Sequence, residues 1–185
     1  MSRRWAGTWA LAALAWAAPA AGDSFILAVD AGEQYAYLSP WDQAEPLTDL
    51  GLRFYVNDGE VDFGLGMKYA RNWGGEMSNV GAMTLDFTLR FHERLWGGDD
   101  HVVPFGMLGP TFRHRWAEAV ASPGGGPTEW TTRAGFGLRA GGGLFVTADE
   151  FYVDVTVYGA AELLWPEPSW TAGGGLDLAF GVFLR

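Results

Sequence analysis

The sequence predicts an all-β fold, an eight-stranded antiparallel up-and-down transmembrane β-barrel with a polar, glycine-rich lumen. From residue 23 onward apolar residues recur at every second position, which is the period of a strand and not of a helix. Glycine recurs on the opposite, polar face of these segments, and tryptophan gathers near their ends. Together these observations predict a wall of strands that separates an apolar surface from a polar one.

The composition bounds the size of the protein and excludes several kinds of site. A chain of 185 residues suggests about one domain. It contains no cysteine, which excludes disulfides, thiolate metal sites and a cysteine nucleophile. The net charge of -10, from 12 Lys and Arg against 22 Asp and Glu, argues against nucleic acid as a partner. We expect no cofactor.

The first segment of the chain has the order of a cleaved export signal. Arg3 and Arg4 precede an apolar run over residues 5–18, and small residues follow at 18–22. The run is short for a membrane-spanning helix, so an uncleaved anchor is the less favoured alternative. The predicted organisation is therefore a signal peptide over 1–22 and a barrel domain over 23–185.

Eight strands are expected in the barrel domain. Regular alternation covers residues 50–56, 61–69, 82–91, 130–139, 151–158 and 176–184, and two less regular strands cover 24–37 and 102–116. In the last of these, Pro104 and Pro110 predict bulges or interrupted pairing. Short turns are expected at 57–60, where Asp58 and Gly59 suit a two-residue hairpin, and at 147–150. Longer links are expected at 39–48, 72–79, 117–127 and 166–169.

Alternation by itself fits two opposite barrels. In a soluble, lipocalin-like barrel the apolar face points inward, whereas in a membrane barrel it meets lipid and the polar face lines the lumen. A narrow lumen needs small side chains, and the polar face carries Gly64, Gly66, Gly135, Gly137, Gly141, Gly173, Gly175 and Gly181. Tryptophans near the longer links suit an aromatic girdle, namely Trp41, Trp73, Trp116, Trp130, Trp165 and Trp170. The membrane barrel is therefore favoured.

Three segments carry a resemblance to a known family. Residues 104–110 (PFGMLGP), 134–143 (AGFGLRAGGG) and 147–154 (TADEFYVD) resemble the small outer-membrane β-barrels of Gram-negative bacteria, of the opacity, OmpA-domain and OmpX types. The resemblance implies location in the outer membrane, with both termini periplasmic and the longer links facing outward.

The same resemblance implies partners. These are the lipid and lipopolysaccharide of the outer membrane, and the barrel-assembly machinery during biogenesis. Residues 179–185 (AFGVFLR) are similar to the terminal strand signal that this machinery reads, although Arg185 stands where the family has an aromatic residue. We expect the protein to be a monomer.

Charged residues of both signs share the polar face. They are Arg53, Lys68, Arg90, Arg133 and Arg139 with Asp62, Asp86, Asp154, Glu162 and Asp177, and Asp30 and Asp49 lie on the same face. Isolated charges in a narrow lumen are costly, so we expect a structural network of cross-strand ion pairs. Eight strands leave room for side chains but not for an aqueous channel, so this network is expected to plug the barrel. A narrow conduit is the alternative.

Three further arginines lie near the expected outer ends of strands: Arg71, Arg113 and Arg115. Arginine pairs well with phosphate groups, so these residues are candidates for contact with lipopolysaccharide. The simpler alternative is that they mark the boundary between membrane and water.

The sequence predicts no catalytic, metal-binding or cofactor-binding residue. The serines after residue 23 are Ser24, Ser39, Ser78, Ser122 and Ser169, and the histidines are His92, His101 and His114. No His-x-Ser pair occurs in a strand, and no His, Asp and Glu cluster has the spacing of metal ligands.

The predicted role is therefore non-enzymatic. We expect a structural or surface-interaction protein whose outer links contact lipopolysaccharide, cells or host molecules. A narrow channel for small solutes is the alternative, and a lipid A-modifying enzyme is less favoured.

Overall fold

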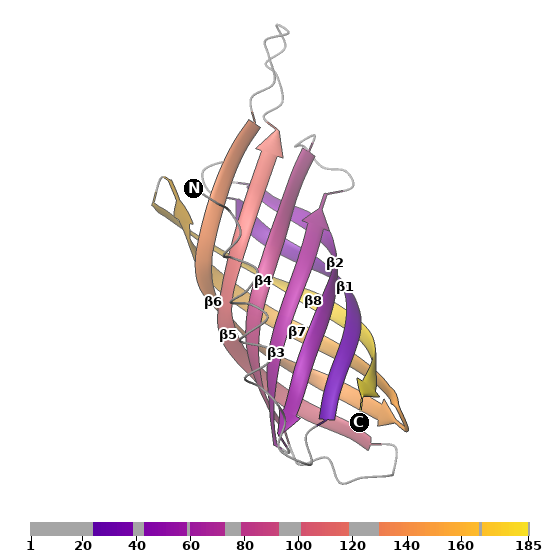
Figure 1. Cartoon of the computed structure of the whole chain (residues 1–185). Helices are drawn as coiled ribbons and strands as arrows, with labels where there is room; N and C mark the ends of the chain where they lie inside the picture. Colours follow the sequence, from indigo (N-terminus) through magenta and orange to yellow (C-terminus); the bar gives the residue numbers. More distant parts are fainter. Residues whose placement is uncertain are drawn as a thin grey trace, which may run out of the picture.

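The computed structural model describes residues 24–38, 43–58, 60–72, 79–92, 101–118, 130–166 and 168–184. Within these ranges eight strands close into one antiparallel barrel, in chain order and with β1 paired to β8 (Figure 1). The strands are β1 (Ser24–Leu38), β2 (Gln43–Asp58), β3 (Val61–Arg71), β4 (Asn79–His92), β5 (His101–Glu118), β6 (Trp130–Ala148), β7 (Phe151–Trp165) and β8 (Ser169–Leu184). This confirms the predicted fold class.

Two parts of the sequence prediction lie outside the described residues. The signal peptide over 1–22 and the middle parts of the longer links stay predictions. In the part of the chain that the structure describes, no helix is long and apolar enough to cross a membrane.

The barrel wall has an apolar outer face and a polar inner one. On β4, Met83, Leu85 and Phe87 are exposed on the outside, whereas Thr84 and Asp86 are buried in the lumen. The same alternation runs along the other strands, because successive side chains of a strand point to opposite faces. A soluble carrier would bury its large apolar residues, whereas this wall presents them outward, as contact with lipid requires.

Both described ends of the chain lie at the same end of the barrel, which we call the terminus end. Phe25 pairs with Leu184 there, and the β6–β7 turn lies close by, where Ala148 pairs with Phe151. Asp149 in this predicted turn has a φ of 52°, the left-handed conformation that a two-residue hairpin needs. We call the opposite end, where β1, β3, β5 and β7 finish, the far end.

At the far end the longest strands, β5 and β6, extend beyond the point where β7 stops pairing with β6. They contain 18 and 19 residues, whereas a tilted strand needs about 9–11 residues to cross a bilayer. Their pairing continues to Glu118 and Trp130, but the β6–β7 ladder stops at Ala134 and Trp165. In Figure 1 these two strands reach higher than the rest of the described barrel.

The sequence prediction made the links at the far end longer than they are in the structure. The sequence predicts a link over 39–48, but residues 43–48 begin β2 and pair with β1. Pro46 is tolerated in this stretch because β3 pairs with β2 only from Thr48 onward, so the stretch is a sheet edge that can lack an N–H donor. Ala117, Glu118 and Ser169, also assigned to links, likewise belong to strands.

Pro110 interrupts a ladder without forming a bulge. The β4–β5 ladder keeps one register on both sides of Gly109 and Pro110, but neither residue is paired within it. Gly109 lies so close to β4 that a Cβ atom would stand 1.7 Å from the carbonyl oxygen of Phe87. The position therefore requires glycine.

We expect Gly109→Ala to lower the free energy of unfolding by about 1–3 kcal/mol, because the added methyl group meets a backbone oxygen. Gly106→Ala is a matched control on the same strand, since a Cβ atom there has no atom within 4 Å. Urea unfolding in detergent, read out by heat-modifiable migration on gels, compares the two variants. Equal stability of the two would contradict the close approach at Gly109.

Candidate functional site

The lumen gathers the buried charges of the protein. Among the described residues, seven cationic and seven anionic side chains are buried there. They are Arg53, Lys68, Arg90, Arg113, Arg115, Arg133 and Arg139 with Asp30, Asp49, Asp62, Asp86, Asp154, Glu162 and Asp177. All ten residues expected in the lumen network belong to this set. Among the described buried side chains, the two signs are equal in number.

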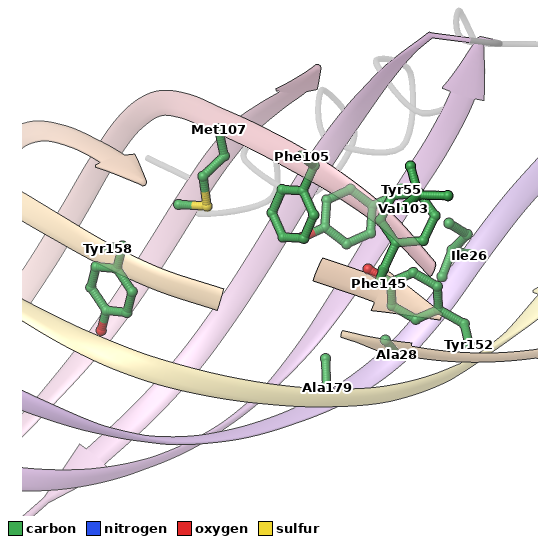
Figure 2. Close-up of a cluster of buried hydrophobic side chains, with 10 residues drawn as sticks. All are labelled: Ile26, Ala28, Tyr55, Val103, Phe105, Met107, Phe145, Tyr152, Tyr158 and Ala179. Carbon is green, nitrogen blue, oxygen red and sulfur yellow. The ribbon is translucent and has the colours of Figure 1, made fainter. Parts of the chain in front are cut away.

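An apolar cluster fills the lumen toward the terminus end. It consists of Ile26, Ala28, Tyr55, Val103, Phe105, Met107, Phe145, Tyr152, Tyr158 and Ala179. Figure 2 shows the rings of Tyr55, Phe105, Phe145 and Tyr152 gathered together from several strands, whereas Tyr158 lies apart from them. The sequence prediction of a lumen lined by glycine and charge is therefore incomplete.

The sequence of β5 is the reason why this cluster could not be predicted. Its lumen face carries Val103, Phe105 and Met107, while the outward face alternates with Pro104 and Gly106. Because neither face of this stretch is charged, polarity alone does not tell which side points inward. Strand pairing settles the question, since β5 must continue the alternation of β4 and β6.

The Arg90 side chain lies among the rings of the apolar cluster and contacts two carboxylates and a hydroxyl group. Its Nε donates to Asp62 Oδ2 at 2.8 Å, and its Nη1 lies 3.2 Å from Asp154 Oδ2 and also bonds the Tyr152 hydroxyl. The guanidinium carbon lies 3.8 Å from the centroid of the Tyr55 ring. This cation is therefore compensated by two carboxylates and an aromatic face, which is what a fully buried charge needs.

The middle of the lumen is built around Lys68. Its ammonium nitrogen lies 2.9 Å from Asp30, 3.2 Å from Asp49 and 2.7 Å from Asp177. These three carboxylates come within 4.8 Å of one another, close enough to hold a metal ion. The Lys68 ammonium group stands among them and supplies the cation itself.

Two more cations join the middle level to its carboxylates. Arg53 Nη2 lies 2.6 Å from Asp30 and 2.5 Å from Asp177. Arg139 Nη1 lies 3.0 Å from Asp86, and its other terminal nitrogen also contacts Asp177. Asp177 thus links three cations from three strands, so ion-paired side chains extend across the lumen at this level.

The described charges of the far level are Arg113, Arg115, Arg133 and Glu162. Glu162 accepts from Arg115 Nη2 at 2.8 Å and lies 3.3 Å from Arg113 Nη1. Arg113 also donates through Nε to the Thr84 hydroxyl at 3.0 Å. Arg133 is buried at the same level and is the register partner of Arg115 across β5 and β6.

The three arginines suggested for lipopolysaccharide contact separate into two groups. Arg71 is exposed on the outer face at the far end. Arg113 and Arg115 are buried in the lumen, each 5% exposed, so a phosphate could reach them only through the far mouth of the barrel. Contact with lipopolysaccharide stays a prediction for all three.

Described tryptophans at the far end lie on the outer surface. Trp165 and Trp170 are exposed, and the half-buried Trp116 packs against Tyr69 with ring centroids 5.9 Å apart. This is the position of a girdle at a membrane boundary. Trp41 and Trp73 lie outside the described residues, as does the side chain of Trp130.

The serine and histidine side chains that the structure describes do not form a nucleophile and base. The Ser169 hydroxyl is buried and makes no hydrogen bond. His92 lies near the terminus end, 3.2 Å from Asp62 and 3.4 Å from Asn57, while His114 is exposed on the outer face. Ser39, Ser78 and Ser122 lie outside the described residues, as do the side chains of Ser24 and His101.

The outward apolar face and the charged lumen define the class of fold, that of the small eight-stranded outer-membrane β-barrels. No protein-family model and no curated protein matches the chain. Several solved structures are similar to the chain. Neisserial surface protein A (NspA) has a TM-score of 0.65 and 13% sequence identity, over 87% of this chain and 98% of that one.

Two further structures are similar to the chain. Ail, the attachment invasion locus protein of Yersinia pestis, has a TM-score of 0.55 and 13% identity, over 87% of this chain and 98% of that one. The outer membrane enzyme PagL has a TM-score of 0.54 and 16% identity, over 82% of this chain and 97% of that one. At these identities the likeness concerns the fold alone.

Proposed function

We propose that the chain is a non-enzymatic outer-membrane protein that anchors a surface-interaction site at its far end. The observation that carries this proposal is the packing of the lumen, where an apolar cluster and two levels of ion pairs lie between the strands. If these side chains plug the barrel, its outer wall and its far end are the surfaces left for interaction.

The extended β5–β6 pair supports an interaction role. Its pairing continues to Glu118 and Trp130, past the end of the β6–β7 ladder at Ala134 and Trp165. Two similar structures bear names that suit such a role, a surface protein and an attachment invasion locus protein. Ail has also been solved in complex with the heparin analogue sucrose octasulfate.

The proposal includes the orientation and assembly of the barrel. The far end faces outward and the terminus end faces the periplasm, after cleavage of the signal peptide over 1–22. The barrel-assembly machinery inserts the chain as a monomer. Cell fractionation with surface labelling of a tag placed beside Trp130 tests the orientation, since labelling in intact cells is expected only for an outward far end.

Arg71 is the residue on the outer wall that we assign to lipopolysaccharide. It lies on the outward face where β3 ends, and its register partner is Thr48 of β2. Tyr69, two residues earlier on the same face, packs against Trp116 with the two rings tilted. A cation at that depth can pair with a headgroup phosphate.

We expect Arg71→Glu to reduce the lipopolysaccharide that co-purifies with the barrel by about fivefold, since an exposed ion pair contributes about 1 kcal/mol. Thr132→Glu, also at the exposed far end, adds a negative charge without removing a cation and serves as the control. Quantifying lipid A in the purified proteins gives the readout. If both variants lose lipopolysaccharide equally, general repulsion rather than Arg71 explains the effect.

The non-enzymatic part of the proposal has its own test, because PagL combines this fold with enzyme activity. Mass spectrometry compares lipid A acyl composition between strains that contain and lack the protein. The proposal expects identical lipid A. A change in acyl composition that follows the protein would overturn it.

A further inference from the structure

The outer wall of the barrel carries two charged side chains of opposite sign. Among the strand side chains that the structure describes, Glu33 of β1 and Arg71 of β3 are the only Asp, Glu, Lys or Arg residues that face outward. A charge on the lipid-facing wall is costly in the bilayer centre and tolerated near the headgroups. The depth and the spacing of these two residues therefore tell what they meet.

Glu33 and Arg71 lie in one row across three strands. Thr48 of β2 is the register partner of Glu33 on one side and of Arg71 on the other. Since neighbouring strands lie about 4.8 Å apart, the backbones of the two charged residues stand about 10 Å apart, with Thr48 between them. The Thr48 hydroxyl donates to Glu33 Oε1 at 2.5 Å, which holds the carboxylate over β2, on the side of Arg71.

This row lies at the edge of the apolar band. Toward the terminus end, every described outward side chain of β1, β2 and β3 is apolar or aromatic, beginning with Ala31, Leu50 and Tyr69 next to the row. Polar headgroups flank the hydrocarbon core of a bilayer, so a row just beyond the apolar band lies at their depth. The row therefore presents an anion, a hydroxyl group and a cation to lipid headgroups.

We propose that Glu33, Thr48 and Arg71 form a site for a phosphoethanolamine headgroup. The Arg71 guanidinium pairs with the phosphate, and the Glu33 carboxylate accepts from the primary ammonium group. Phosphoethanolamine joins one anion and one cation by a short spacer, so its charges complement those of the row. The inference rests on the proposed contact between Arg71 and a headgroup phosphate, and adds the class of headgroup that the site selects.

Two lipids of equal net charge test this selectivity. The folded protein, freed of lipid in detergent, is offered equal amounts of phosphatidylethanolamine and phosphatidylcholine with identical acyl chains, and native mass spectrometry counts the bound lipids. Both headgroups carry one phosphate and one cation, but the choline nitrogen has no N–H group to donate. We expect the wild-type protein to bind phosphatidylethanolamine about threefold more than phosphatidylcholine, the scale of one exposed charged contact.

Substitutions on the row and away from it separate the two charges. Glu33→Gln is expected to abolish the preference for phosphatidylethanolamine, because the neutral amide no longer attracts the ammonium group. Arg71→Gln is expected to lower the binding of both lipids, which share the phosphate. Glu150→Gln removes the same charge from an exposed glutamate in the β6–β7 turn, at the terminus end, and is expected to keep the wild-type preference.

Competition by lipid A identifies the source of the headgroup. Displacement of phosphatidylethanolamine by lipid A that carries phosphoethanolamine, but not by unmodified lipid A, would assign the site to lipopolysaccharide. A preference for phosphatidylethanolamine that neither form of lipid A disturbs would assign it to a phospholipid.

Failure of this inference is distinct from failure of the proposed function. Equal binding of the two lipids by the wild-type protein, or a preference that survives Glu33→Gln, would overturn the headgroup assignment and leave the phosphate contact of Arg71 standing. If Arg71→Gln lowered the binding of neither lipid, the proposed phosphate contact would fail and this inference with it.

Discussion

Replacing Arg90 with methionine is expected to destabilise the barrel by about 3–5 kcal/mol, the cost of leaving buried carboxylates without their cation. Arg90 is 1% exposed and contacts both Asp62 and Asp154. Methionine has a similar length and fits among the rings of the apolar cluster, so lost charge compensation rather than a cavity dominates the effect.

Two comparisons isolate the electrostatic part of this loss. Arg71→Met removes an exposed arginine and is expected to change stability by less than about 0.5 kcal/mol. The triple variant Arg90→Met, Asp62→Asn, Asp154→Asn removes the whole charged group and is expected to recover most of the lost stability. Urea unfolding of the three variants in detergent measures both effects, and a triple variant no more stable than Arg90→Met would contradict the explanation.

Lys68→Met is expected to have the second large effect, again about 3–5 kcal/mol. Asp30, Asp49 and Asp177 lie within 4.8 Å of one another, and without the ammonium group only Arg53, which bridges Asp30 and Asp177, and Arg139, which contacts Asp177, are left to compensate them. Repulsion among these carboxylates then opposes folding. Adding Asp49→Asn to Lys68→Met is expected to restore part of the stability, because it removes one of the repelling charges.

Calcium binding gives a second test of the position of Lys68 among Asp30, Asp49 and Asp177. Because the three carboxylates have the mutual distances of metal ligands, calcium is expected to stabilise Lys68→Met but not the wild-type protein, in which Lys68 supplies the cation. The midpoint of thermal unfolding with and without calcium measures this. Equal calcium responses of the two proteins would contradict the placement of Lys68 among the carboxylates.

The sequence predicted the two faces of the wall well because most strands contrast strongly in polarity. On β4, for example, Leu85 and Phe87 alternate with Asp86, and burial follows that alternation. The positions of the expected lumen charges could be predicted for the same reason.

The partners of those charges could not be predicted, because they depend on register between strands distant in sequence. Asp177 lies 124 residues from Arg53, yet the closure of β1 on β8 brings the two side chains together. On β5 the inward face changes along its length, from the apolar Val103 and Phe105 to the cationic Arg113 and Arg115. No single polarity pattern describes such a strand, so the apolar cluster and the far arginines became apparent only with the pairing.

The central claim is that the lumen is closed by side chains, so that the barrel anchors a surface site rather than conducting solutes. Single-channel recording of the purified, folded protein in planar lipid bilayers tests it most directly, with a porin reconstituted in parallel to establish sensitivity. The closed lumen predicts a baseline without steady conductance at either polarity. Steady, porin-sized current steps that scale with the amount of folded protein would contradict it.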